Sequence, residues 1–339
     1  MERARVMPTY FYIDSCYNST AMILISGGTG FIGTVLIRHL TNLGYPVKLL
    51  IRPSKDSPNL PRGIPVEVAV SSLGDKKGLR AAMKDVDIVY HLASAERFGR
   101  KAALTEVDIE GTQSLVEVAT QAKIKRFIYL SHLGADRSSA YPLLKSKAIA
   151  EHYILHSGIP YTIFRSAVAF GEGDHFTNGL AFLLKVSPFL VMLPENGSTL
   201  LQPIWVEDLV RVMTWSLEMP QTINQRIELG GPEYLSFREI CEIIMEAINI
   251  RRRFINVKPV FLRTVTELIE IILPAFPTSV FWLDTLASNR TTNLDVLPRM
   301  FDLLPARMSE RLGHLRGKKF RKNWWRLLGK RKRTLRQWE

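Results

Sequence analysis

A glycine-rich segment near the N-terminus constrains the fold of this chain more than any other feature. It reads Gly-Gly-Thr-Gly-Phe-Ile-Gly over residues 27–33, between a short apolar run (22–26) and a helical pattern that ends at Gly44. Glycine there permits a tight turn and a close approach of the backbone to phosphates, and the helix N-terminus offers unpaired N–H groups to an anion. We therefore expect this turn to bind the pyrophosphate of a dinucleotide.

The expected contact residues of the turn are Gly27, Thr29, Gly30, Phe31, Ile32 and Gly33. Their glycines follow a GxxGxxG spacing rather than the GxGxxG of the dehydrogenase fingerprint, so the pattern by itself is weak. Its position between a strand and a helix strengthens it. A purely structural glycine turn is the alternative interpretation.

Short apolar runs alternate with helical patterns over the first half of the chain, which is typical of βαβ units. The expected strands cover residues 22–26, 47–51, 66–70, 87–91, 126–131 and 161–165. The expected helices cover residues 33–43, 76–84, 110–122 and 142–156. Several strands are apolar on both faces, as in a parallel sheet covered by helices on both sides. This predicts an α/β Rossmann fold with a doubly wound parallel sheet.

The pattern predicts four segments. Residues 1–20 form an extension that we expect to be disordered, and residues 21–170 form the NAD(P)-binding Rossmann domain. Residues 171–305 form a smaller, partly helical substrate or lid region, with short strands at 203–206 and 227–229 and a capping box that opens a helix at Ser236. Prolines divide helical patterns over 254–304, and residues 306–339 form a basic tail that contains tryptophan.

The end of the second strand bears on which dinucleotide binds. An acidic residue there would hydrogen-bond the ribose 2′-hydroxyl of NAD(H), whereas an arginine accommodates the 2′-phosphate of NADP(H). The strand is followed by Arg52, with Lys55 close behind and no carboxylate at its end. The pattern favours NADP(H) over NAD(H), with Arg52 as a contact. A solvated strand end is the alternative for this residue.

Several motifs resemble the extended short-chain dehydrogenases/reductases, the superfamily of NAD-dependent epimerases and dehydratases. They are the glycine turn and the segments Tyr90–Ala93, Val107–Thr112, Ser146–Glu151 and Pro203–Leu209. Two further stretches, Ser131–Ala135 and Phe170–Phe176, are similar to the atypical branch. That branch includes NmrA-like proteins and the nucleotide-binding accessory subunit of mitochondrial complex I.

The resemblance implies roles for individual residues. Leu92 and Ala93 would flank the adenosine, and Ser131 would lie near the nicotinamide at the end of the fifth strand. Lys147 would contact the ribose hydroxyls of the cofactor, whether or not the cofactor is turned over.

The catalytic triad of the family is matched only in part. It consists of a serine, a tyrosine and a lysine four residues after the tyrosine, because a nearby ammonium lowers the pKa of the phenol that exchanges the proton. Leu143 stands four residues before Lys147, whereas Tyr141 lies six residues before it, at the predicted helix entry. The candidate catalytic residues are Ser131, Tyr141 and Lys147. His132, in the place of a second serine, is an alternative proton donor.

The charge of the chain is concentrated at its end. The formal net charge is +13, and residues 316–339 hold eleven Lys/Arg and one acid, a net +10, which leaves +3 for the rest. Aromatic and aliphatic residues interleave with these bases, as in a basic helix at an anionic lipid surface. We expect this tail to meet an anionic membrane surface. A solvated tail is the alternative, and nucleic acid is the least favoured partner.

Cysteine usage and hydropathy indicate the compartment. Cys16 and Cys241 have neither metal-ligand spacing nor disulfide density, so we expect no metal site and a reducing environment. No stretch reaches about 18 apolar residues, and no secretory signal is present in the first twenty. The expected location is cytoplasmic, including a peripheral position on the inner face of the membrane.

Two functions remain open at this point. Apolar clusters over residues 182–192 and 254–286 favour an NADP-dependent reductase, dehydrogenase or epimerase with a hydrophobic, lipid-linked or quinone-linked substrate. Core packing is the alternative reading of these clusters. The misplaced tyrosine favours a catalytically silent protein that binds NADPH for structural or regulatory reasons.

Overall fold

The computed structural model describes residues 20–54, 63–187, 189–272 and 280–317. Almost all of the expected N-terminal extension, and the tail from residue 318 onward, lie outside the described residues. A seven-stranded sheet has the order β11-β6-β5-β4-β1-β2-β3, and every neighbouring pair is parallel. Its strands are β1 (Ile23–Ser26), β2 (Val47–Ile51), β3 (Glu67–Val70), β4 (Ile88–His91), β5 (Arg126–His132), β6 (Tyr161–Ser166) and β11 (Gln225–Leu229).

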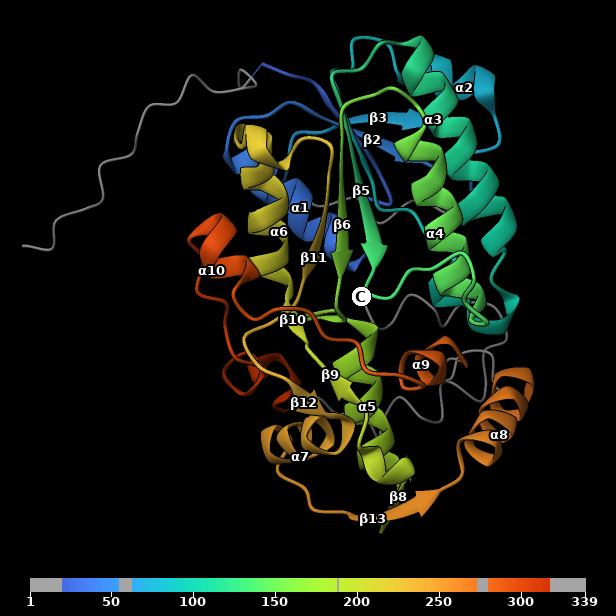
Figure 1. Ribbon diagram of the computed structural model, residues 1–339, viewed down its shortest axis with the longest axis vertical. Helices are drawn as coiled ribbons and strands as arrows, with labels where there is room; N and C mark the ends of the chain where they lie inside the picture. The colour runs from blue at the N-terminus through green and yellow to red at the C-terminus, as the bar shows by residue number, and fades with distance from the viewer. Residues whose placement is uncertain (1–19, 55–62, 188, 273–279, 318–339) are drawn as a thin grey trace, which may run out of the picture.

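Helices cover both faces of this sheet (Figure 1). One face carries α1 (Phe31–Asn42) and α6 (Val206–Trp215), and the other carries α2 (Lys76–Ala82), α3 (Gly111–Gln121) and α4 (Pro142–Leu155). Successive strand residues point to opposite faces, so Ile23 and Ile25 pack under α1 while Leu24 packs under the other layer. This burial on both faces explains the continuous apolar runs of the strands, and the predicted Rossmann fold is confirmed.

The sheet takes in residues from beyond position 170. Strand β11 pairs with β6 at the sheet edge, and α6 packs against α1. The expected short strand at 227–229 is therefore a full member of the central sheet. The dinucleotide-binding layer is built from two stretches of chain, with the smaller lobe inserted between and after them.

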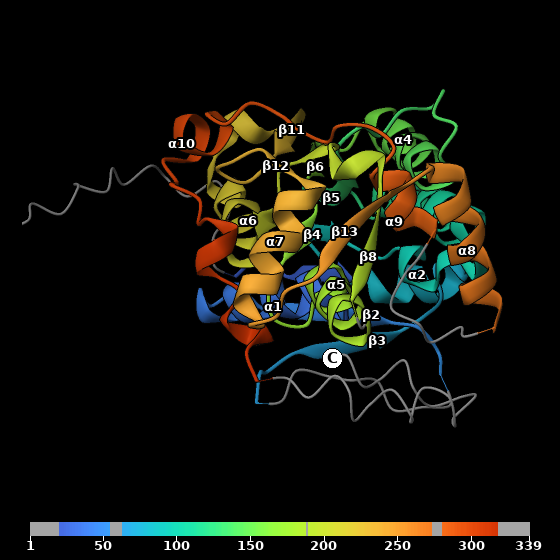
Figure 2. The ribbon, with the colours of Figure 1, turned by 90° about the horizontal axis from the view of Figure 1, so that it is seen from below.

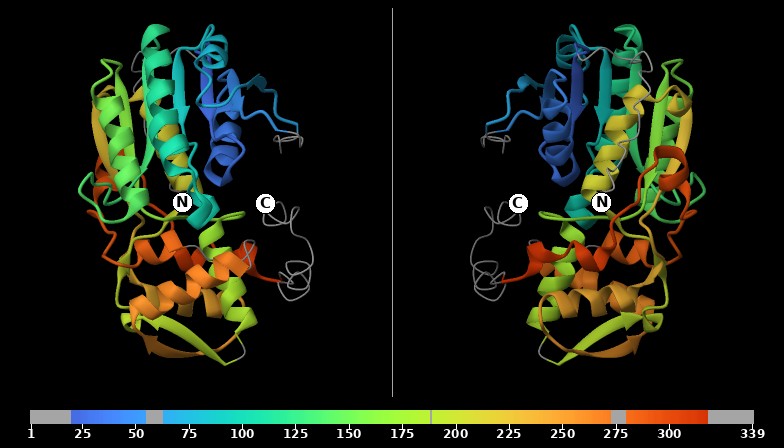
Figure 3. Two further views of the ribbon diagram at one scale, coloured as in Figure 1. Left: turned by 90° about the vertical axis from the view of Figure 1, so that its right-hand side faces the viewer. Right: turned by 90° about the vertical axis from the view of Figure 1, so that its left-hand side faces the viewer.

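The smaller lobe lies beyond the carboxyl ends of the central strands (Figure 3). Its helices are α5 (His175–Val186), α7 (Phe237–Ala247), α8 (Pro259–Ile272) and α9 (Val280–Thr285), whereas α10 (Val296–Phe301) packs against β11 and α6 of the sheet layer. Its strand pairs are β8 (Leu190–Pro194) with β13 (Arg253–Val257), β9 (Leu200–Leu201) with β12 (Leu235–Ser236), and β7 (Ala169–Phe170) with β10 (Ile204–Trp205). The capping box is confirmed: Ser236 accepts from the Glu239 amide, and the Glu239 carboxylate accepts from the Ser236 amide.

Two features bear on the expected location and metal content. Within the described ranges, no helix combines the length and apolar character needed to cross a bilayer. Cys241 is buried and not in a disulfide, and the described part of the chain contains no group of His, Cys, Asp or Glu side chains able to hold a metal ion.

Candidate functional site

The glycine turn brings three pieces of backbone into close contact. Gly27 has φ +77°, and a Cβ atom there would lie 2.6 Å from the Ala93 amide nitrogen. A Cβ atom at Gly33 would lie 2.4 Å from the Gly27 carbonyl oxygen. No other residue fits at either position, because these neighbours are backbone atoms that cannot move aside. The turn after β1, the start of α1 and the segment after β4 therefore pack main chain against main chain.

The first turn of α1 is open to an anion. Gly30 is the N-cap residue, no side chain caps the helix, and its first turn contains no acidic residue. Among the residues that the structure describes, a Cβ at Gly30 would meet only the Gly27 carbonyl oxygen, at 3.3 Å. Thr29, Gly30 and Phe31 are each partly exposed. Helix N-termini of this kind attract phosphate groups through their N–H groups and dipole.

The other predicted dinucleotide contacts lie at the same edge of the sheet. Leu92 and Ala93 directly follow β4, and the Leu92 amide donates to the Ser26 carbonyl at 3.0 Å. Arg52 directly follows β2, is exposed, and has its guanidinium carbon 6.0 Å from the centre of the Phe98 ring. Because the carboxyl ends of parallel strands share one edge, all of the predicted dinucleotide contacts except Lys147 follow β1, β2 and β4 there.

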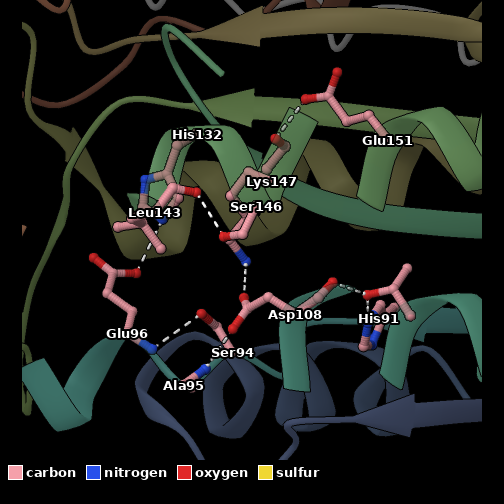
Figure 4. A network of polar contacts seen from close by, with 12 residues as sticks. His91, Ser94, Ala95, Glu96, Asp108, His132, Leu143, Ser146, Lys147 and Glu151 are labelled. Atoms are coloured by element: carbon pink, nitrogen blue, oxygen red, sulfur yellow. Dashed lines mark hydrogen bonds and ion pairs between the residues drawn. The ribbon is translucent and has the colours of Figure 1, made fainter. Parts of the chain in front are cut away.

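Lys147 lies in a buried ion pair (Figure 4). Its Nζ atom is 3.1 Å from Asp108 Oδ1, and the two side chains are 4% and 0% exposed. The other carboxylate oxygen of Asp108 accepts from the Ala95 amide at 2.9 Å. Asp108 thus joins the lysine of α4 to the loop that follows β4.

The charge of Lys147 is secured by its surroundings. Burial alone lowers the pKa of this ammonium, but Tyr129, Asp108 and Glu96 outweigh burial and raise it. The Nζ atom also lies 5.4 Å from the centre of the Tyr129 ring. Lys147 is therefore protonated at neutral pH, and its ammonium interacts with the Asp108 carboxylate and the Tyr129 ring.

Ser131 is also bound within the protein. Its hydroxyl donates to Glu151 Oε1 at 2.5 Å, and Arg165 Nη2 donates to Glu151 Oε2 at 2.6 Å. The Ser131 side chain is buried, as is that of Glu151. The serine thus belongs to a polar link between β5, α4 and β6.

Tyr141 lies at the entry of α4, as the proline that follows it predicted. It is the N-cap residue of α4, one turn before Lys145, which is exposed. The position four residues before Lys147 is Leu143, which packs in an apolar cluster with Ala95 and with Phe281 of α9. The place expected for a proton-donating phenol is therefore filled by an apolar contact between the sheet domain and the smaller lobe.

One acid–base pair remains accessible. His132 Nε2 is 3.0 Å from Glu96 Oε2, and the two side chains are 32% and 38% exposed. Burial alone raises the pKa of Glu96, but the His132 imidazole outweighs it and the pKa falls to about 2. An ionised carboxylate thus holds an imidazole at the end of β5, next to Ser131 in sequence.

His91 has a structural role at the base of this network. Thr112 donates its hydroxyl proton to the Asp108 carbonyl, so its oxygen accepts from His91 Nε2 at 2.8 Å. His91 Nδ1 then accepts from the Ser26 hydroxyl at 2.5 Å. Burial, reinforced by the charge of Lys147, lowers the pKa of His91 to about 3. This neutral imidazole fixes β1 and β4 beside the glycine turn.

Sequence reasoning did not single out Asp108 or Glu96 as site residues. Asp108 lies in the segment Val107–Thr112, which the sequence analysis used only as a motif of the family resemblance. Its carboxylate was the signal that could have identified it as a site residue. Glu96 follows β4 by five residues, and nothing in its local pattern indicates that it faces His132 from another strand.

The smaller lobe contains an apolar cavity of about 90 Å³. It lies between α5, β8, α7, α8 and α9, and its lining includes Leu180, Leu184, Val191, Phe237, Leu262 and Leu286. Helix α9 separates this cavity from the site: Phe281 packs on Leu143, while Leu283 and Leu286 line the cavity.

Comparison with protein families and curated proteins identifies a family and relatives of this chain. A model of the NmrA-like family matches residues 19–289. NADH dehydrogenase (ubiquinone) 1 alpha subcomplex subunit 9, mitochondrial, of Arabidopsis thaliana is 28% identical over 241 residues, which cover 68% of this chain and 59% of that protein. Ceramide reductase of Caulobacter vibrioides is 29% identical over 191 residues, which cover 56% of this chain and 59% of that protein. The matches thus span less than two thirds of either relative.

The fold is also that of a solved enzyme. UDP-glucose 4-epimerase of Thermus thermophilus, in complex with NAD, superposes with a TM-score of 0.65 at 19% identity. The superposition covers 87% of this chain and 97% of the epimerase.

Proposed function

We propose that this chain, which belongs to the NmrA-like family, binds NADP(H) at the glycine turn and holds it for a structural or regulatory purpose without turning it over. One combined observation supports this proposal: the glycine turn is accessible to a ligand, whereas the expected catalytic positions are occupied by contacts within the protein. Gly30 and its helix remain available to a pyrophosphate, whereas Leu143 stands in place of the phenol and Lys147 is paired with Asp108.

A relative's name agrees with a role of this fold as one component of a larger assembly. The Arabidopsis relative is named as a subunit of NADH dehydrogenase. We therefore propose for this chain a role as a cofactor-loaded component that another protein or assembly recognises. The bound dinucleotide would then stabilise the folded state, because a ligand that binds only the native protein raises its stability.

The preference for NADP(H) is assigned to Arg52. Loss of a charge-assisted contact to the 2′-phosphate costs roughly 1.5–3 kcal/mol, which is about 10–100-fold in affinity. Calorimetric titration of Arg52→Ala should show this loss for NADPH and less than about twofold change for NADH. Arg226→Ala, at an exposed arginine on β11, is the matched control. Equal weakening of both cofactors, or tighter binding of NADH by the unaltered chain, would contradict the assignment.

A second candidate function rests on the His132–Glu96 pair and on the apolar cavity. An imidazole at the end of β5 can donate a proton while NADPH donates hydride. The apolar lining of the smaller lobe favours a hydrophobic or lipid- or quinone-linked substrate, whose reactive end would have to pass α9, the helix between the cavity and the site. The Caulobacter relative is named as a ceramide reductase, and ceramide is a lipid. The chain would then be an NADP-dependent reductase without the usual tyrosine.

The two candidates differ in NADPH oxidation. With a short-chain ubiquinone analogue or a long-chain aliphatic ketone present, the primary proposal predicts that absorbance at the NADPH band stays constant. The reductase candidate predicts oxidation whose kcat falls at least about 100-fold in His132→Ala, because general acids contribute on that order. His156→Ala, at an exposed histidine after α4, is the control. Oxidation that depends on His132 would replace the primary proposal with the second.

The basic tail, residues 316–339, is proposed to bind an anionic membrane surface. Each Lys or Arg near such a surface contributes about 1 kcal/mol, reduced by salt. Removal of residues 318–339 should therefore lower affinity for phosphatidylserine vesicles at least about tenfold, with NADPH affinity unchanged. Preferential binding of RNA over vesicles at equal salt would contradict this partner.

A further inference from the structure

A cluster of exposed apolar side chains lies at the end of the smaller lobe that is farthest from the sheet. Strands β8 and β13 run in parallel there, with Leu190 opposite Arg253 and Met192 opposite Ile255. One side of this ribbon packs inward through Val191 and Leu193. Leu190, Met192 and Ile255 are 49%, 40% and 38% exposed. Phe189, directly before β8, is 77% exposed.

Helix α8 continues the exposed apolar surface. Helix α8 contacts β8. In Figure 2, which looks at this end of the lobe from below, β8 and β13 cross the middle of the view and α8 lies to their right. Val260, Phe261 and Leu268 are 76%, 56% and 53% exposed. Their spacing places them on one side of the helix, while Leu262 and Thr266 face the cavity behind. Of the large apolar side chains that are exposed in the described part of the chain, seven of fourteen lie on these elements.

The charges of β8, β13 and the first half of α8 are all positive. Neither residues 175–194 nor residues 249–266 contain an Asp or Glu. Arg251, Arg253 and Lys258 are exposed at the edges of the apolar cluster. Arg252 is held inward, where its Nε donates to the carbonyls of Leu184 and Ser187. The second half of α8 contains Glu267 and Glu270. The carboxylates of the adjoining elements are those of α7, Glu195 after β8, and Asp284, and both Glu267 and Asp284 pair with Arg263.

We infer that this surface, formed by residues 189–192, 251–258 and the exposed side of α8, docks on an anionic lipid bilayer. Exposed aromatic and aliphatic side chains enter the boundary between headgroups and acyl chains, and arginine and lysine beside them meet anionic headgroups. Contiguous apolar surface of this kind marks an interaction site. A second copy of the chain is disfavoured, because Arg251, Arg253 and Lys258 give this surface a positive edge, and pairing it with its own copy would bring like charges together.

This surface is separate from the glycine turn, and none of its residues belongs to the basic tail. It lies on the far side of the smaller lobe from the carboxyl edge of the sheet (Figure 1). Docking there leaves the dinucleotide edge uncovered, so membrane binding and cofactor binding do not exclude one another. The inference does not rest on the proposed function, and NADPH affinity is measured separately on every variant.

The first test compares affinities of the full chain for vesicles made of equal parts phosphatidylcholine and phosphatidylserine. Phe189→Asp combined with Phe261→Asp should weaken binding at least about tenfold, since both side chains would have to leave the interface. Leu304→Asp, at a side chain that is 84% exposed on another part of the surface, should change it less than about twofold. Arg251→Glu combined with Arg253→Glu should also weaken binding without a change in the core.

The second test shows which part of the protein touches the vesicle, independently of any contribution of the basic tail to vesicle affinity. A polarity-sensitive dye is attached to Phe261→Cys or to Leu304→Cys in a Cys16→Ser background, in which Cys241 is buried. Addition of vesicles should shift the emission of the dye at position 261 to the blue and leave that at 304 unchanged. The inference fails if the dye at 261 does not respond, or if the Phe189 and Phe261 variants change self-association or binding of an acidic protein while vesicle affinity stays the same.

Discussion

A Gly30→Glu variant is expected to fold and to lose at least about 100-fold of its affinity for NADPH. The φ of Gly30 is −85°, which other residues adopt readily, and an added Cβ meets only the Gly27 carbonyl oxygen at 3.3 Å. The carboxylate, however, would stand at the helix N-terminus where the pyrophosphate has to lie. Two unit charges 4 Å apart repel by about 4 kcal/mol at an effective dielectric constant of about 20, and each 1.4 kcal/mol is tenfold in affinity.

The measurement is a calorimetric titration with NADPH, accompanied by thermal melting to establish folding. Gly313→Glu is the matched control, because within the described residues a Cβ at Gly313 meets no atom within 4 Å and the residue is exposed, far in sequence from the strand ends that form the dinucleotide edge. The control should bind NADPH as the unaltered chain does. A folded Gly30→Glu chain with unchanged affinity would remove the glycine turn as the cofactor site.

An Asp108→Asn variant should lose about 3–5 kcal/mol of its free energy of unfolding, because it leaves the Lys147 ammonium buried without its counter-charge. The same reasoning predicts that Lys147→Met added to Asp108→Asn restores more than half of the loss. The double variant has no ammonium at position 147, so no buried charge is left without solvation or a counter-charge. Asp295→Asn breaks the ion pair between Asp295 and Arg299, whose side chains are 58% and 70% exposed, respectively. This change should lower the free energy of unfolding by at most about 0.5 kcal/mol.

The pH dependence of this effect has a definite sign. The pKa of Lys147 is raised in the folded protein, so the contribution of the pair is fully present below the unfolded lysine pKa of about 10.4 and is lost as the pH rises beyond it. The destabilisation of Asp108→Asn, measured by urea unfolding, should therefore stay constant between about pH 6 and 9. A loss below about 1 kcal/mol would show that Asp108 is not the essential partner of Lys147.

The sequence contained enough information for the Rossmann layer because its signals are local. Apolar runs of strand length, the glycine turn and the capping box at Ser236 depend on neighbouring residues only, and the structure confirms each of them. The place of β11 could not be predicted in this way. Its pairing with β6 joins residues about 60 positions apart, and no local period encodes that contact.

The catalytic part of the site was less predictable for the same reason. The spacing around Lys147 indicated an incomplete triad, but the partner that fixes this lysine comes from a π-helical turn, Thr105–Glu110, which precedes α3 and packs against α4. The stretch 254–304 was expected to be helical between prolines, yet it begins in β13, because pairing with β8 outweighs its helical period. The short run Phe254–Val257 is compatible with a helix or a strand, so its pairing with β8 determines that it forms a strand.

The most direct test of the central claim is a crystal structure of the chain with bound NADP⁺. We predict that the pyrophosphate lies on the glycine turn at the N-terminus of α1 and that the 2′-phosphate contacts Arg52. We also predict that neither the Tyr141 hydroxyl nor the Lys147 ammonium lies within hydrogen-bond reach of a substrate position at the nicotinamide. A pyrophosphate elsewhere would contradict the cofactor assignment. A Tyr141 hydroxyl beside the nicotinamide, with Lys147 released from Asp108, would contradict the conclusion that the cofactor is held without turnover.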